Sequence, residues 1–156
     1  MVTALNILYS KAAIARILGV AVSKIKGFQK WWRVCWVWVE GQRPRLFSLS
    51  IFKQHFVDHR KAQAREIYVS RVRGNSFRAV NPKKGSAYDI YALPEGIDCS
   101  CEDFSNQIIF LKKGCCKHGY ALLKYLGFDS LADYVEQHQW VDSSHPPHEN
   151  DDINTW

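Results

Sequence analysis

The spacing of apolar residues predicts two helices, a hairpin and a third helix in the first part of the chain. Apolar positions recur at helical spacing across residues 9–32, with Gly19 in the middle. They alternate across residues 33–49 on both sides of a Gly-Gln-Arg-Pro segment, which is typical of a β-hairpin. Helical spacing returns over residues 51–65. The predicted order is therefore helix, helix, hairpin, helix.

The period of the pattern changes to two near residue 67. Three strands separated by Gly-Asn and Asn-Pro-Lys-Lys-Gly turns are predicted, at residues 67–73, 76–80 and 87–93. Helical patterns follow at about residues 117–126 and 129–138. The elements together predict an α+β protein.

These changes of pattern predict two small domains and a tail. We expect one domain over residues 1–64, a second over residues 65–140, and a disordered acidic tail over residues 141–156. No apolar run reaches the roughly 18 residues of a membrane span, and no signal-peptide pattern opens the chain. We therefore expect a cytoplasmic protein that makes no membrane contact, associated with the nucleoid if it is bacterial.

The charge is unevenly distributed along the chain. The whole sequence has 21 basic and 15 acidic residues, a net charge of +6. Residues 1–61 hold eleven Lys and Arg against only Glu40 and Asp58, whereas residues 99–156 hold four Lys against nine acids. A basic segment favours a polyanionic partner such as nucleic acid, because Lys and Arg neutralise phosphates. An ordinary solvated basic surface is the alternative.

The cysteines are concentrated in one short segment. Of five cysteines, four lie within residues 99–116, and the pattern is Cys99-Ser-Cys101, fourteen residues, then Cys116-Lys-His118. Thiolates and imidazole suit zinc, which binds four tetrahedral ligands in structural sites. Two such pairs can converge on one ion, with Cys115 as the alternative third cysteine. The pattern predicts one structural Zn²⁺ ion.

Residues 66–126 resemble the SWIM zinc-finger family, whose motif is C-x-C-x(n)-C-x-H after a β-hairpin and before a helix. The Cys-Lys-His-Gly-Tyr-Ala-Leu-Leu segment that begins at Cys116 is similar to the start of that helix. The resemblance implies a small ββ(β)α zinc-binding module with a nucleic-acid or protein partner. Its C-x-H spacing selects Cys116 over Cys115, so the implied ligands are Cys99, Cys101, Cys116 and His118.

Residues 9–61 resemble the winged helix-turn-helix of the MerR/excisionase type. The resemblance rests on the spacing of Ala15, Gly19, Ile25 and Phe28, and on the hairpin and helix that follow. It implies helices at residues 10–18 and 23–32, a wing at residues 33–48, and double-stranded DNA as the partner. The residues expected to contact DNA are Ser23, Lys24, Lys26, Gln29, Lys30, Arg33, Arg43 and Arg45.

Trp36 and Trp38 share one side of the predicted hairpin. We expect them to form the core of the wing; the alternative is that their rings stack on bases, as in proteins that bind single strands.

The sequence contains no phosphate-binding loop, nucleophile elbow, zinc-protease motif or dinucleotide fingerprint, so we expect no enzymatic activity. The expected function is a zinc-containing DNA-binding protein, acting in transcriptional regulation or as an accessory to recombination, transposition or replication. The alternative is an adaptor subunit that docks on a nucleic-acid-processing complex through the SWIM-like module.

Overall fold

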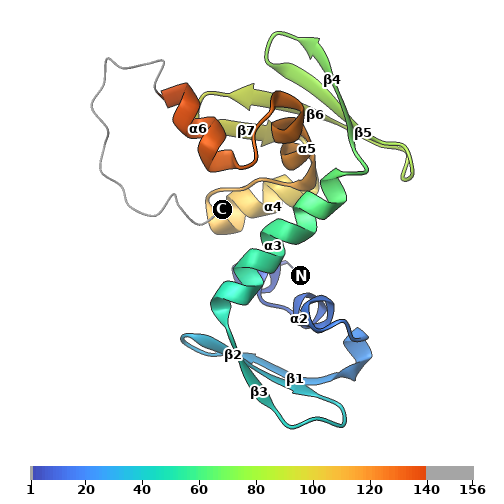
Figure 1. The fold of residues 1–156 in the computed structure, drawn as a ribbon, viewed down its shortest axis with the longest axis vertical. Helices are drawn as coiled ribbons and strands as arrows, with labels where there is room; N and C mark the ends of the chain where they lie inside the picture. Colours follow the sequence, from blue (N-terminus) through green and yellow to red (C-terminus); the bar gives the residue numbers. More distant parts are fainter. Residues whose placement is uncertain (1, 140–156) are drawn as a thin grey trace. The chain divides into compact units, whose positions relative to one another are not determined.

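The computed structural model describes residues 2–139, and these residues belong to two compact units (Figure 1). Unit 1 ends at His59 and unit 2 begins at Arg60. His59 and Arg60 lie within helix α3 (Leu49–Ala64). The domain boundary expected after residue 64 falls at the end of the same helix. The acidic tail expected at residues 141–156 lies outside the described residues.

Unit 1 consists of two N-terminal helices, a three-stranded antiparallel sheet and the first part of α3. The sheet has the order β1-β2-β3. A single 3-10 turn, η1, precedes the sheet. The elements are α1 (Ala4–Leu8), α2 (Lys11–Leu18), η1 (Val22–Lys24), β1 (Ile25–Lys30), β2 (Val34–Val39) and β3 (Arg45–Ser48).

Helix α2 begins and ends where the sequence predicts. The Ser10 hydroxyl accepts a 3.1 Å hydrogen bond from the backbone N–H of Ala13, which caps the first turn. Gly19 ends the helix in the left-handed conformation, with φ of 67°, which a residue without Cβ adopts at little cost.

The predicted second helix, residues 23–32, is wrong. Residues 25–30 form strand β1, which pairs antiparallel with β2. Ile25 and Phe28 have the spacing of a helix face, but the pairing register shifts between Ile25 and Gly27, where Lys26 is the extra residue of a bulge. The extra residue places Ile25 and Phe28 on the same face of a strand. The described residues 22–32 therefore present no recognition helix, and the helix-turn-helix arrangement is not formed.

One face of the unit 1 sheet is covered by helices. Ile14 of α2 and Phe52 of α3 are fully buried against Cys35, Val37 and Val39 of β2. In Figure 1, α2 and the beginning of α3 lie on the same side of β1, β2 and β3.

Trp36 and Trp38 alternate with these core residues and therefore belong to the opposite face of the sheet. The expectation that the two tryptophans form the core is wrong, because the intervening smaller residues of β2 fill that role.

Unit 2 is a four-stranded antiparallel sheet with order β4-β5-β6-β7 and three helices besides the end of α3. The three strands and two helices expected from the sequence are present, whereas β7 and α4 were not expected. Phe77, Ile90, Leu122 and Leu123 form part of its core. The elements are β4 (Tyr68–Arg73), β5 (Ser76–Asn81), β6 (Ser86–Leu93), β7 (Gly96–Cys99), α4 (Glu102–Leu111), α5 (Lys117–Leu126) and α6 (Leu131–Gln139).

The architecture agrees with the α+β class expected from the sequence, with two antiparallel sheets and several helices. Among residues 2–139, no helix combines the length and the hydrophobicity that crossing a membrane requires.

Candidate metal centre

Three element boundaries of unit 2 bring four potential metal ligands together. Cys99 is the last residue of β7, and Cys101 precedes the first turn of α4. Cys116 precedes the first turn of α5, and His118 is the second residue of that helix. All four side chains are buried. Their ligand atoms lie within 4.8 Å of one another, so the four residues could hold a metal ion.

Two distances from His118 are close to those of tetrahedral coordination. Nδ1 of His118 lies 3.7 Å from Sγ of Cys99 and 3.8 Å from Sγ of Cys116. A tetrahedral zinc ion, with bonds of about 2.3 Å to sulfur and about 2.0–2.1 Å to nitrogen, separates nitrogen from sulfur by about 3.5–3.6 Å and sulfur from sulfur by about 3.8 Å. Nδ1 is therefore the histidine atom placed to act as ligand.

Two of the cysteines occupy helix N-cap positions. Sγ of Cys101 accepts a hydrogen bond from the N–H of Phe104, and Sγ of Cys116 accepts one from the N–H of Gly119, both at 3.4 Å. The partial positive charge of a helix N-terminus stabilises a thiolate. At Cys101 the N-terminus of α4 thus favours the deprotonated form that a metal requires.

The close thiols also shift one another's pKa. The pKa of Cys101 lies well below its ordinary value, because the thiols of Cys116 and Cys99 donate hydrogen bonds to its sulfur. Donating these bonds raises the pKa of Cys116, and it raises the pKa of Cys99 to about 12. A bound cation replaces the two retained protons and neutralises the crowded sulfurs.

His118 is enclosed on its other side. Its ring lies 4.5 Å from the ring of Tyr88, centroid to centroid. Its Nε2 is buried and has no hydrogen-bond partner among the described residues. Imidazole with Nε2 protonated leaves the lone pair of Nδ1 free to bind a cation, which fits the ligand geometry above.

Cys115 does not belong to the cluster of ligand atoms. Its thiol is buried and directed to the carbonyl oxygen of Cys116, at 3.9 Å. A Cβ on Gly119 would lie 2.9 Å from Sγ of Cys115, so the absence of a side chain at residue 119 makes room for this sulfur. Cys115 is thus a packing residue beside the site, and burial raises the pKa of its thiol.

A polar network fixes the loop that carries Cys116. The buried side chain of Gln107 accepts a 3.0 Å hydrogen bond from the N–H of Cys115 and donates one of 3.1 Å to Asp103. Arg60 binds both carboxylate oxygens of Asp103, at 2.7 and 3.0 Å. Nothing in the spacing of these three residues along the sequence indicates that they meet.

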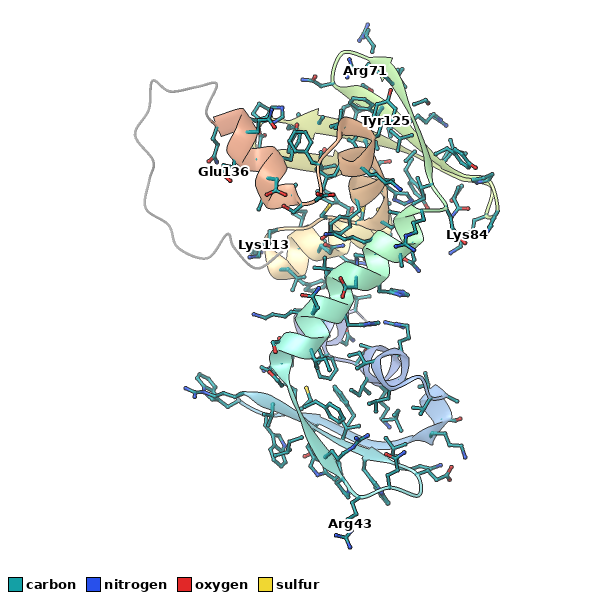
Figure 2. All side chains as sticks on the ribbon, viewed as in Figure 1. Arg43, Arg71, Lys84, Lys113, Tyr125 and Glu136 are labelled. Carbon is teal, nitrogen blue, oxygen red and sulfur yellow. The ribbon has the colours of Figure 1, made fainter. Side chains whose placement is uncertain are left out.

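The residues expected to contact DNA come from several elements of unit 1. Ser23 and Lys24 lie in η1, and Lys26, Gln29 and Lys30 in β1. Arg45 lies in β3, whereas Arg33 and Arg43 lie in the turns before and after β2; Figure 2 shows Arg43 at the tip of the β2–β3 turn.

Several of these side chains have partners within unit 1. Lys24 and Lys26 bind Glu40 at 2.6 and 3.1 Å, and both hold the pKa of its carboxyl below the ordinary value. Lys30 lies over the ring of Tyr9 on the core side of the sheet.

No protein-family model, curated protein sequence or solved structure matches this chain.

Proposed function

We propose that this chain is a zinc-containing, non-enzymatic nucleic-acid-binding protein. Unit 1 carries the nucleic-acid contact, and a zinc ion stabilises unit 2. Such a protein would act in transcriptional regulation or as an accessory to recombination, transposition or replication.

Zinc is the ion that the four ligands favour. Three thiolates and an imidazole are soft and borderline ligands, and their tetrahedral spacing matches structural zinc sites. Four protein ligands leave no coordination position for water, which argues for a structural rather than a catalytic ion. The ion would link β7, α4 and α5 across the 14-residue segment that separates the two ligand pairs.

The SWIM-like assignment of unit 2 is part of the same proposal. Its support is the order of elements: an antiparallel sheet leads to Cys99 and Cys101, and Cys116 and His118 open a helix whose apolar face packs in the core. That order agrees with the motif and with its position before a helix.

The observation that carries nucleic-acid binding is the charge of unit 1. Residues 22–48 contain six Lys and Arg side chains, all exposed, and a single carboxylate. That carboxylate, Glu40, is already bound by Lys24 and Lys26. The remaining cations of this segment have no carboxylate within it to neutralise them, and a polyanion would do so.

Binding of labelled DNA, measured by fluorescence anisotropy between 50 and 300 mM salt, tests this function. We expect log K to fall linearly with log salt. The double variant Arg33→Ala/Arg43→Ala should weaken binding and reduce the salt slope by about 1–2. The charge-matched control Lys11→Ala/Lys53→Ala changes two cations on the helices α2 and α3 and should bind like wild type. No binding to any nucleic acid at 50 mM salt would contradict the proposal.

A second candidate function, an adaptor subunit, has one observation in its favour. Helix α4 exposes Ile108 and Ile109, and Ile108 borders an open groove of about 380 Å³ in unit 2. Exposed apolar residues beside a groove suit a protein partner. Absence of nucleic-acid binding at low salt would favour this candidate.

A further inference from the structure

The outer face of the β1-β2-β3 sheet, opposite the helices, is unusually aromatic. We call it the tryptophan face and define it as Gly27, Gln29, Trp31, Trp36, Trp38 and Leu46. The strand register places Trp38 beside Gly27, and Trp36 between Gln29 and Leu46. Trp31, Trp38 and Leu46 are 46%, 44% and 57% exposed. Large apolar side chains gathered on one exposed surface indicate a binding site.

The indole of Trp36 lies over Gly27, which has no side chain to displace it. A Cβ on Gly27 would lie 2.8 Å from Cη2 of Trp36 and closer still to Cζ3, so the indole occupies the space above the β1 backbone. Trp36 is consequently half-buried, whereas Trp38, two residues further along the strand, is exposed. Side chains two residues apart on a strand are about 7 Å apart.

Trp31 extends the same face beyond the end of the strand. Its indole Nε1 donates a 3.3 Å hydrogen bond to Oε1 of Gln29, which is paired with Trp36 on the outer face. The backbone N–H of Trp31 is bound to the carbonyl of Val34, which closes the β1–β2 turn. Three indoles therefore follow one another across the sheet.

We infer that the tryptophan face binds single-stranded DNA by stacking unpaired bases on Trp31, Trp36 and Trp38. This inference rests on the proposed nucleic-acid-binding function and specifies the form of the nucleic acid. Rows of exposed aromatic rings bordered by cations bind single strands, because every base has a stacking face once it is unpaired. A duplex hides those faces, and the helix that would enter its major groove is a strand here.

The surrounding charge suits the phosphates of that strand. Arg33 lies in the turn at the Trp31 end of the face, and Arg43 projects from the turn at the other end of β2 (Figure 2). Both residues are exposed. Residues 1–57 contain one carboxylate, Glu40, and it is bound by two lysines. The face thus combines stacking surfaces with cations at both ends.

The polar groups at the tryptophan face do not distinguish ribose from deoxyribose. Oε1 of Gln29 accepts a hydrogen bond from Trp31. Beside the face, Ser48 is paired with Val34, and its hydroxyl is 2.8 Å from that of Ser50. Recognition of RNA at a given position uses its 2′-hydroxyl, and the acceptor oxygen of Gln29 already has a partner. Stacking on DNA therefore requires no further group from the protein.

The test uses the full chain with its metal and a fluorescein-labelled 15-nucleotide DNA strand of mixed sequence. The unlabelled competitors are the same DNA strand, the same sequence as a blunt duplex, and the same sequence as RNA. Variants Trp38→Ala, Trp31→Ala and Trp38→Phe are compared with Tyr68→Ala, which removes an aromatic ring that is 72% exposed in unit 2. Thermal unfolding and metal content confirm that each variant is folded.

We expect the single strand to compete better than the duplex, and RNA to compete within a few-fold of DNA. Each tryptophan-to-alanine variant should weaken single-strand binding by about 5- to 150-fold. Trp38→Phe should lose less, because a smaller ring still stacks, and Tyr68→Ala should bind like wild type.

Four results would overturn the inference. If the duplex binds better than the single strand, or if folded Trp38→Ala and Trp31→Ala bind like wild type, nucleic-acid binding stands but the tryptophan face is not its site. If RNA binds and the DNA strand does not, single-stranded DNA is not the ligand of the tryptophan face. If no nucleic acid binds at 50 mM salt, the proposed function fails together with the inference.

Discussion

Gln107 accepts a hydrogen bond from the buried backbone N–H of Cys115, at 3.0 Å, one residue before Cys116 of the potential metal site. The same side chain donates to Asp103, which Arg60 holds by two bonds. A side chain from the middle of α4 therefore positions the loop that delivers Cys116. This contact has no counterpart in the sequence motif.

Replacing Gln107 with Leu keeps the volume and leaves the N–H of Cys115 without a partner. We expect the free energy of unfolding of unit 2 to fall by about 1–3 kcal/mol, the cost of an unsatisfied buried polar group. Chemical denaturation of the metal-loaded protein measures this change in the free energy of unfolding. The control Gln137→Leu alters an exposed glutamine of α6 and should have a smaller effect. Equal stability of the two variants would show that the network does not support the loop.

Gly27 gives a second prediction, for unit 1. Replacing a strand glycine with valine usually strengthens the strand. Here the new side chain would meet the indole of Trp36, so we expect Gly27→Val to destabilise unit 1 by about 1–3 kcal/mol. The matched control is Gln29→Val, at the next outward position of β1. Denaturation followed by tryptophan fluorescence measures both; a stabilised Gly27→Val would contradict the packing described for Trp36.

Substitutions can distinguish the proposed metal ligands from the neighbouring Cys115. We expect one zinc ion per chain by elemental analysis, and loss of the ion in Cys116→Ser or His118→Asn. Cys115→Ser should keep the ion, because this thiol is turned to a carbonyl oxygen instead of the other ligands. Loss of zinc from Cys115→Ser together with retention by Cys116→Ser would reverse the assignment.

Zinc binding should release protons and weaken as the pH falls. The pKa of Cys99 is raised to about 12 and that of Cys116 is also raised, so both thiols carry protons at pH 7 before the ion binds. The pKa of Cys101 is lowered, so this sulfur is already a thiolate. Since metal coordination requires thiolates, we expect about two protons released per ion at pH 7.

Titration calorimetry in buffers of different ionisation enthalpy counts these protons. An affinity that is independent of pH between 6 and 8 would contradict the raised pKa values, because protons would then not compete with the ion.

The cluster of three cysteines and one histidine, and several element boundaries, could be predicted from the sequence. Cys-x-Cys and Cys-x-His pairs place ligands on short, nearly rigid segments, so spacing along the chain translates into proximity in space. The N-cap Ser10 and the left-handed Gly19 likewise act within one turn of helix. Such local chemistry is readable from the order of residues alone.

The prediction from the sequence was wrong where apolar residues of strand β1 have the spacing of a helix. Ile25 and Phe28 are three residues apart, and the bulge at Lys26 places both on the core side of β1. Hydrophobic spacing does not reveal a bulge, because the extra residue depends on pairing with β2. The same pairing decides that Trp36 faces outward, and a single strand considered alone does not show which of its faces the helices cover.

X-ray absorption at the zinc edge of the purified protein reports the atoms bound to the ion, and so it examines coordination by the four side chains themselves. We expect four ligands, three sulfurs at about 2.3 Å and one nitrogen at about 2.0–2.1 Å. An ion with oxygen ligands or with fewer than three sulfurs, or a folded protein that contains no zinc, would contradict it.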